Sequence, residues 1–249
     1  MTGKSPVLLV TGGSRGIGAA VSIAAARQGW AVAVNYATDE AASSQVVERI
    51  KAKGRIARSF RFDVRNGDTQ RSGLAAIRDQ LGPVDVIVNN ATGPQPELAL
   101  DQQTWQHYTD QMEFALRAPF ELLQWMLPDW RARGGGAVIN IGSEAAELGS
   151  ANAGHYVAAK GAMLAATRSW AKELAKDNIR INVVAPGWIP VERHEEWPDE
   201  RKKRYIDLVP FGRFGVPQDI ANAVVFLASD KSGFITGQRI AVNGGRIFL

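Results

Sequence analysis

The chain of 249 residues contains no cysteine, which excludes disulfides, thiolate metal sites and cysteine nucleophiles. No stretch approaches the roughly 20 apolar residues of a membrane span, and the N-terminus leads into an apolar stretch too short for a signal peptide. Basic residues outnumber acidic ones by only 29 to 25. That excess is too small for a nucleic-acid interface, and no nucleic-acid-binding module is recognisable. We therefore expect a cytoplasmic globular protein with no membrane partner, no nucleic-acid partner and no metal site.

Short apolar segments alternate with longer helix-like segments along the whole chain. The predicted strands are residues 7–10, 31–34, 84–88, 137–141, 180–184 and 239–242, with a weaker one at 56–62. The predicted helices are residues 17–28, 40–53, 69–81, 105–131, 156–176 and 218–228. This alternation predicts a parallel sheet with helices on both faces.

Right-handed crossovers turn such a sheet into a doubly wound α/β fold, here a Rossmann fold of about seven parallel strands. There is no internal repeat, low-complexity tract or linker, so residues 1–249 are expected to form a single domain. Residues 188–215 are rich in proline, tryptophan and charge. We interpret them as an excursion from the sheet that forms a substrate lid.

A glycine-rich turn, Thr11-Gly-Gly-Ser-Arg-Gly-Ile-Gly18, follows the first strand and opens the first helix. Glycines in such a turn allow the backbone to approach a pyrophosphate, and the helix N-terminus offers free N–H groups to the same anion. The turn therefore predicts dinucleotide binding. An unliganded glycine turn is the alternative, which the strand–turn–helix context disfavours.

The end of the second strand predicts which dinucleotide binds. An acidic residue there binds the ribose of NAD, whereas Asn35 and Tyr36 stand here and the first carboxylate is Asp39. Arg15 in the glycine turn could pair with the 2′-phosphate of NADP. Both observations favour NADP(H), while Asp39 and Glu40 keep NAD(H) possible.

Two polar segments follow later strands, where ligands bind in sheets of this kind. Asp63-Val64 ends the weak third strand, and Asn89-Asn90-Ala91 ends the fourth. A further pair, Tyr156 and Lys160, is spaced four residues apart on a predicted helix and so shares one face. A nearby ammonium favours the phenolate and lowers the pKa of a tyrosine, which would make Tyr156 a usable general acid.

Together these motifs resemble the short-chain dehydrogenase/reductase family, from Thr11 to Gly245 and in the family's order. The chain looks most similar to its 3-oxoacyl-(acyl-carrier-protein) reductase and glucose-dehydrogenase-like branches. The resemblance implies a catalytic set of Ser143, Tyr156 and Lys160, in which Ser143 hydrogen-bonds the substrate carbonyl and Lys160 also holds the nicotinamide ribose. It implies a small-molecule carbonyl or alcohol substrate and a homotetramer or homodimer. The cofactor-binding residues expected are Gly12, Ser14, Arg15, Gly16, Ile17, Gly18, Asn35, Tyr36, Asp63, Val64, Asn89, Ala91, Tyr156, Lys160, Pro186, Gly187 and Ile189.

The chain departs from the family pattern at three positions. Ala115 stands where the family carries an asparagine that steadies a water in the proton relay; Gln111 could replace it through a water, or backbone carbonyls could suffice. Thr92 stands where a glycine usually follows Asn-Asn-Ala. Val191 replaces a threonine that hydrogen-bonds the nicotinamide carboxamide, a loss of about 1 kcal/mol.

Two hypotheses follow. The first is an NADP(H)-dependent oxidoreductase that transfers a hydride between nicotinamide and a carbonyl or alcohol, with Tyr156 as general acid and base. The second, motivated by the three departures, is a dinucleotide-binding regulatory or scaffolding protein with little activity. The lid should be aromatic, with Trp188, Trp197, Phe211 and Phe214, and the run Arg201–Arg204 is either a solvated helix face or a contact for an anionic substrate tail.

Overall fold

One parallel sheet organises the molecule. The computed structural model describes residues 5–190 and 197–248. Its seven strands lie in the order β3-β2-β1-β4-β5-β6-β7, and every neighbouring pair is parallel. The strands are β1 (Val7–Val10), β2 (Ala31–Tyr36), β3 (Ala57–Arg61), β4 (Val84–Asn89), β5 (Gly136–Ile141), β6 (Ile179–Pro186) and β7 (Arg239–Val242).

Helices cover both faces of this sheet. They are α1 (Gly16–Arg27), α2 (Glu40–Lys51), α3 (Gly67–Gln80), α4 (Trp105–Met112), α5 (Ala118–Arg133), α6 (Ala145–Leu148), α7 (Gly154–Leu174), α8 (Asp199–Ile206) and α9 (Pro217–Ala228). Three short segments, η1 (Leu100–Gln102), η3 (Ala175–Asp177) and η5 (Asp230–Ser232), are 3₁₀ turns. Among the described residues no helix combines the length and the apolar character needed to cross a bilayer.

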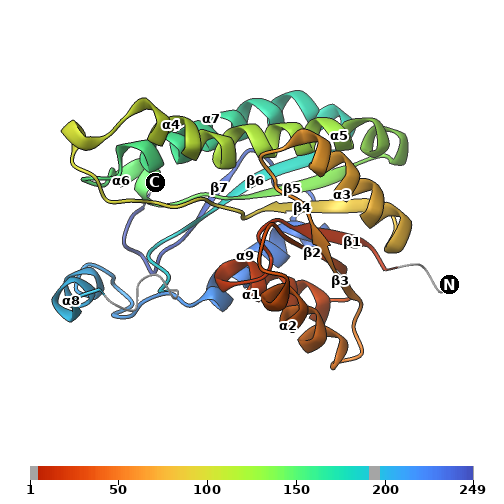
Figure 1. Ribbon diagram of the computed structural model, residues 1–249, viewed down its shortest axis with the longest axis horizontal. Coiled ribbons are helices and arrows are strands. Elements are labelled where there is room, and N and C mark those ends of the chain that lie inside the picture. The colour runs from red at the N-terminus through yellow and green to blue at the C-terminus, as the bar shows by residue number, and fades with distance from the viewer. Residues whose placement is uncertain (1–4, 191–196, 249) are drawn as a thin grey trace.

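Two hydrophobic layers separate the sheet from its helices. Figure 1 shows α3, α5 and α7 on one side of the sheet and α1, α2 and α9 on the other. The first layer contains Ile77, Leu122 and Ala171, and the second contains Val21 and Ile220. The sequence-based prediction of a doubly wound α/β fold with seven parallel strands is confirmed.

Burial explains why some strands were easier to predict than others. All residues of β1 and β2 are buried, as expected for strands covered on both faces, so each reads as a continuous apolar run. At the edge of the sheet β3 has exposed positions at Arg58 and Arg61. These positions break the apolar run and account for the weak signal at residues 56–62.

The strand order reverses direction between β1 and β4, which are neighbours although they are far apart in the sequence. Val10 pairs with Val88, and the next residue, Thr11, donates its backbone N–H to the Val88 carbonyl at 3.0 Å. Where strand order reverses, the loops leaving the two strands turn to opposite faces and open a crevice. The fold therefore places a ligand site at the carboxyl ends of β1 and β4.

The long helix predicted at residues 105–131 contains an irregularity. It consists of α4, a π-helical turn η2 (Glu113–Arg117) and α5, in direct succession. Such turns insert one extra residue into a helix and are frequent at functional sites. Ala115 lies in this turn.

Candidate functional site

The glycine turn has the shape that a pyrophosphate requires. Gly12 adopts a φ of 59°, in the left-handed region that favours glycine. A Cβ atom added to Gly18 would lie 2.2 Å from the carbonyl oxygen of Gly12, so no side chain fits there. The close approach brings the start of α1 against the turn, and no side chain caps that helix end. Backbone N–H groups at the start of α1 therefore remain for an anion, which fits the dinucleotide cofactor predicted from the sequence.

The turn is clamped from the end of β4. Asn90 donates its side-chain amide to the carbonyl oxygens of Thr11 at 3.0 Å and Gly12 at 2.9 Å. In return the Thr11 hydroxyl oxygen accepts the backbone N–H groups of Asn90 at 2.9 Å and Ala91 at 3.1 Å. Asn90 is a functional residue beyond the cofactor residues expected from the sequence, and its position in the motif at the end of a central strand is the signal that could identify it.

Two of the expected cofactor residues have their polar groups engaged inside the protein. Asn35 is buried, accepts the Gly12 N–H at 3.1 Å and donates to the Phe62 carbonyl at 2.9 Å. Asn89 is also buried and donates to Asn140 at 2.8 Å, in a polar chain that continues from Asn140 to a threonine of α7. Asn35 therefore fixes the glycine turn, and Asn89 joins β4 to β5.

At the ribose end an ion pair links the two residues on which the cofactor preference depends. A guanidinium nitrogen of Arg15 lies 3.0 Å from a carboxylate oxygen of Asp39, and both side chains are partly exposed. The other oxygen of Asp39 accepts the Ala42 N–H at 2.9 Å and so caps α2. Both carboxylate oxygens of Asp39 therefore have partners, one in Arg15 and the other in the first turn of α2.

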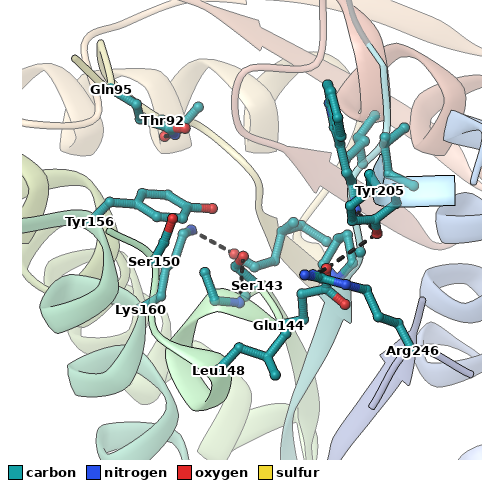
Figure 2. A pocket seen from close by; sticks show the side chains of 18 of the residues that line it. Thr92, Gln95, Ser143, Glu144, Leu148, Ser150, Tyr156, Lys160, Tyr205 and Arg246 are labelled. Atoms are coloured by element: carbon teal, nitrogen blue, oxygen red, sulfur yellow. Dashed lines mark hydrogen bonds and ion pairs between the residues drawn. The ribbon is translucent and has the colours of Figure 1, made fainter. Parts of the chain in front are cut away.

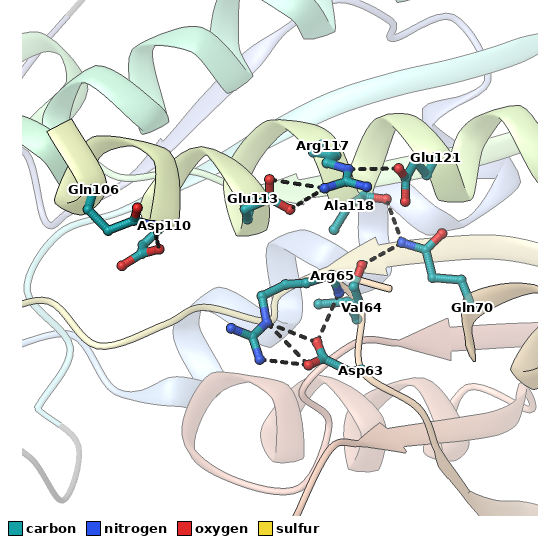
Figure 3. Close-up of polar contacts among 10 residues, drawn as sticks. All are labelled: Asp63, Val64, Arg65, Gln70, Gln106, Asp110, Glu113, Arg117, Ala118 and Glu121. Atoms are coloured by element: carbon teal, nitrogen blue, oxygen red, sulfur yellow. Dashed lines mark hydrogen bonds and ion pairs between the residues drawn. The ribbon is translucent and has the colours of Figure 1, made fainter. Parts of the chain in front are cut away.

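The segment Asp63-Val64, expected to bind the cofactor, is held in two ways, both visible in Figure 3. A hydrogen bond from the Arg65 side chain lowers the pKa of the Asp63 carboxyl, assisted by the Arg65 backbone N–H and charge and opposed by burial. The amide of Gln70, which is fully buried, donates to the Val64 carbonyl at 2.5 Å and to the Ala118 carbonyl at 3.5 Å. The loop is therefore fixed to both α3 and α5.

The three predicted catalytic residues lie together. Tyr156 and Lys160 come from the first turns of α7, and Ser143 from the loop that follows β5. Lys160 is buried and donates to the Ile141 carbonyl at 2.7 Å, with its ammonium 5.8 Å from the centre of the Tyr156 ring. Ser143 accepts the Ala145 N–H at 3.1 Å, which leaves its own proton for another acceptor. In Figure 2 the Tyr156 hydroxyl points to the side on which Ser143 lies.

A cavity of about 440 Å³ opens in front of these side chains. It joins the predicted catalytic residues to part of the predicted cofactor residues, namely Ile17, Pro186, Gly187 and Ile189. The outer cofactor residues, among them Arg15, Tyr36 and Asp63, are not part of its wall. The cavity is therefore the candidate site for the reacting ends of cofactor and substrate.

The far wall of the cavity is aromatic, and most of it was predicted. The Trp188 ring lies 4.6 Å from the Trp197 ring and 4.9 Å from the Phe214 ring, measured between centres. Phe211 does not join them: it is 75% exposed, and its backbone N–H donates to the Gly244 carbonyl at 3.2 Å. The fourth aromatic partner is instead Tyr205 of α8, 5.2 Å from Trp188.

The departures from the family pattern have different outcomes. Ala115 is buried in an apolar cluster with Ala159 and Met163 of α7. Gln111 is buried as well and donates its amide to the Pro94 carbonyl at 2.5 Å. Thr92 lines the cavity. Val191 lies outside the described residues.

Comparison with known proteins agrees with this geometry. Residues 12–246 match a family model described as enoyl-(acyl carrier protein) reductase. The chain is 39% identical to a 3-oxoacyl-(acyl-carrier-protein) reductase of Staphylococcus aureus over 95% of this chain and 96% of the relative. It is 38% identical to an acetoacetyl-CoA reductase of Shinella zoogloeoides, over 98% of this chain and all of the relative, and 37% identical to one of Rhizobium meliloti, over 98% and 99%.

Proposed function

The chain belongs to the short-chain dehydrogenase/reductase family and is an oxidoreductase of carbonyl and alcohol groups, and on that premise we propose that it reduces a 3-oxoacyl thioester with NADPH. The single observation that carries the proposal is the convergence of Ser143, Tyr156 and Lys160 on one cavity. The names of the relatives support the substrate class.

The proposed chemistry divides between cofactor and protein. When bound, the dinucleotide supplies the hydride that reduces the carbonyl carbon. Negative charge then develops on the carbonyl oxygen and must be met by hydrogen-bond donors. The Ser143 hydroxyl donates to that oxygen, and Tyr156 transfers its proton to it as general acid. The buried ammonium of Lys160 stabilises the phenolate that remains.

The names of the relatives favour reduction of a carbonyl group over reduction of the carbon–carbon double bond that the description of the family model names. Two hydroxyl groups, those of Ser143 and Tyr156, line the same cavity. A carbonyl oxygen needs hydrogen-bond donors as its negative charge grows.

The preference for NADPH is supported by charge at the ribose end. Arg15 belongs to the glycine turn, and the second strand ends in Asn35 and Tyr36, neither of which is acidic. Asp39, the carboxylate that keeps NAD(H) possible, already pairs with Arg15. A 2′-phosphate can replace Asp39 as the partner of this arginine.

Arg204 is the proposed contact for the anionic tail of a thioester substrate. In the basic run of α8, Arg201 pairs with Glu97, Lys202 with Asp199, and Lys203 with Asp207. Arg204 lines the cavity and has no carboxylate within 4.0 Å among the described residues.

A homotetramer or homodimer and a cytoplasmic location, both expected from the sequence, remain part of the proposal.

The decisive experiment measures NADPH oxidation with acetoacetyl-CoA and a panel of neutral ketones. The wild-type chain should turn over the thioester, and Tyr156→Phe should lower kcat by about 10²- to 10⁴-fold, the usual contribution of a general acid. NADPH binding, followed by cofactor fluorescence, should be retained in the variant. Unchanged turnover in the variant contradicts the assignment of Tyr156. Binding without turnover on every substrate would instead support a regulatory or scaffolding protein.

A further inference from the structure

A buried carboxylate stands next to the candidate catalytic serine. Glu144 follows Ser143 directly and is only 5% exposed. One of its oxygens contacts the Arg246 guanidinium and accepts the Tyr205 hydroxyl at 3.2 Å. Figure 2 shows Glu144, Tyr205 and Arg246 together, with Ser143 between this group and the Tyr156–Lys160 pair. Burial of a carboxylate costs free energy unless hydrogen-bond donors satisfy it, so Arg246 and Tyr205 stabilise Glu144 in its buried position. Because Glu144 is adjacent to Ser143, the same two contacts fix the loop that carries Ser143.

The Tyr205 hydroxyl joins further segments at the same point. It accepts the Trp188 backbone N–H at 2.6 Å while it donates to Glu144. A Cβ added to Gly187 would lie 2.6 Å from the Tyr205 oxygen, so the phenol is pressed against the turn that leaves β6. The Arg246 guanidinium lies 4.7 Å from the centre of the Tyr205 ring. One phenol therefore contacts the serine loop, the turn after β6 and the C-terminal segment.

The helix that carries Tyr205 lies at the surface. Not one residue of α8 is buried. The ion pair between Arg201 and Glu97 joins two half-exposed side chains and is expected to contribute little, and the Arg201 guanidinium lies 3.5 Å from the centre of the Trp197 ring. The ring of Tyr205 packs on Trp188 and stacks on Phe214 at 5.5 Å. Burial raises the pKa of Tyr205 to about 12, so its hydroxyl stays a donor at all physiological pH values.

From these contacts we infer that Tyr205 is a positioning residue: its hydroxyl docks α8 beside the cavity by way of Glu144, so that docking of α8 and placement of Ser143 occur together. The inference rests on the proposed reductase function for its kinetic readout. Without the hydroxyl, the docked arrangement of α8 is less populated, and the apparent affinity for substrate falls in proportion to that population.

The test uses Tyr205→Phe, which keeps the ring and its stacking and removes only the hydroxyl. We expect kcat/KM for acetoacetyl-CoA to fall about tenfold, mainly through KM, since an unsatisfied N–H and a less satisfied carboxylate typically cost a factor of that order. The pH profile of kcat should not change, because Tyr156 is untouched. Lys203→Gln, on the outer side of the same helix, is the matched control and should leave both constants unchanged.

A double-variant cycle with Glu144→Gln separates docking from simple loss of stability. If Tyr205 acts through Glu144, the double variant should be no worse than the more damaged single variant, whereas independent structural effects would add. Additive effects, a change below twofold, or a loss confined to kcat would each overturn the inference.

Limited trypsin digestion gives a readout that does not depend on turnover. The four basic residues of α8 are trypsin sites, and neither Tyr205→Phe nor Glu144→Gln removes one, so both variants should be cut there faster than the wild-type chain. Faster cleavage in a chain without reductase activity would support the docking while the proposed function fails. Unchanged cleavage in an active enzyme would overturn the docking alone.

Discussion

At the scale of single residues, motif and spacing predicted which side chains gather at the site but not which way they point. Ser143, Tyr156 and Lys160 share one cavity as expected. Asn35 and Asn89 lie at the expected strand ends, yet their amides bond inward to Gly12 and Asn140. A strand end fixes the position of a side chain, whereas the direction of its hydrogen bonds depends on neighbours from distant segments, which a single sequence does not reveal.

The Arg15–Asp39 ion pair leads to a prediction about cofactor choice. Arg15→Ala should raise the KM for NADPH roughly tenfold, as expected for a lost hydrogen bond to a charged group, and leave the KM for NADH nearly unchanged. Asp39→Asn should do the opposite and lower the KM for NADPH, because asparagine still caps α2 while the charge that competes for Arg15 is gone.

Steady-state kinetics with both cofactors checks this pair of variants. Arg58→Ala, an exposed arginine of β3 that bonds Gln80, is the control for a general loss of positive charge. Equal losses with NADPH and NADH in Arg15→Ala would contradict a role at the 2′-phosphate.

At the scale of elements, the sequence predicted every strand and the large helices because buried parallel strands and amphipathic helices have distinct periodicities. It missed α8, whose residues are too polar to show an apolar face, and α6, which is a single turn. It also missed the π-helical turn η2. One extra residue inside a long helix changes the backbone bonding but leaves an apolar pattern that still reads as one helix.

That turn sharpens a prediction for Ala115. Ala115→Asn places an amide against Ala159, the neighbour of Lys160 on α7, where it can steady a water of the proton relay. We expect a higher kcat or a shifted pH profile of kcat, together with a stability lower by about 1–3 kcal/mol, because the surrounding cluster is apolar.

Stopped-flow kinetics across pH and thermal unfolding measure both effects. Ala115→Val, which adds volume without a polar group, shows how much of the stability change is due to overpacking. If kcat and its pH profile are the same in Ala115→Asn as in the wild-type chain, the relay runs by another route, and the carbonyls of η2 become the candidates.

At the scale of the whole molecule, one buried histidine links stability to pH. His155, beside Tyr156, is fully buried, and its pKa is lowered chiefly by desolvation, then by the charge of His107, against a backbone hydrogen bond with Ala153. The folded state thus binds a proton less readily than the unfolded chain. Stability is complete above the unfolded pKa of about 6.5 and is lost as the pH falls below it toward the folded value.

Chemical denaturation between pH 8 and pH 5 should show this decline in the wild-type chain and a flatter profile in His155→Leu. His107→Gln should keep most of the decline, since the charge of His107 is only the second cause. An equally steep profile in all three chains would assign the pH dependence to other groups.

The pairing of β1 with β4 has a consequence for fragments of this protein. Thr11 and Asn90 meet only because those two strands are adjacent in the sheet, and the cavity draws its walls from residues 17 to 246. No continuous half of the chain holds a complete nucleotide turn together with Ser143, Tyr156 and the turn after β6. A truncated or split gene product would therefore be inert unless its pieces reassembled, so activity in a complementation screen of split halves would report on reassembly of the entire sheet.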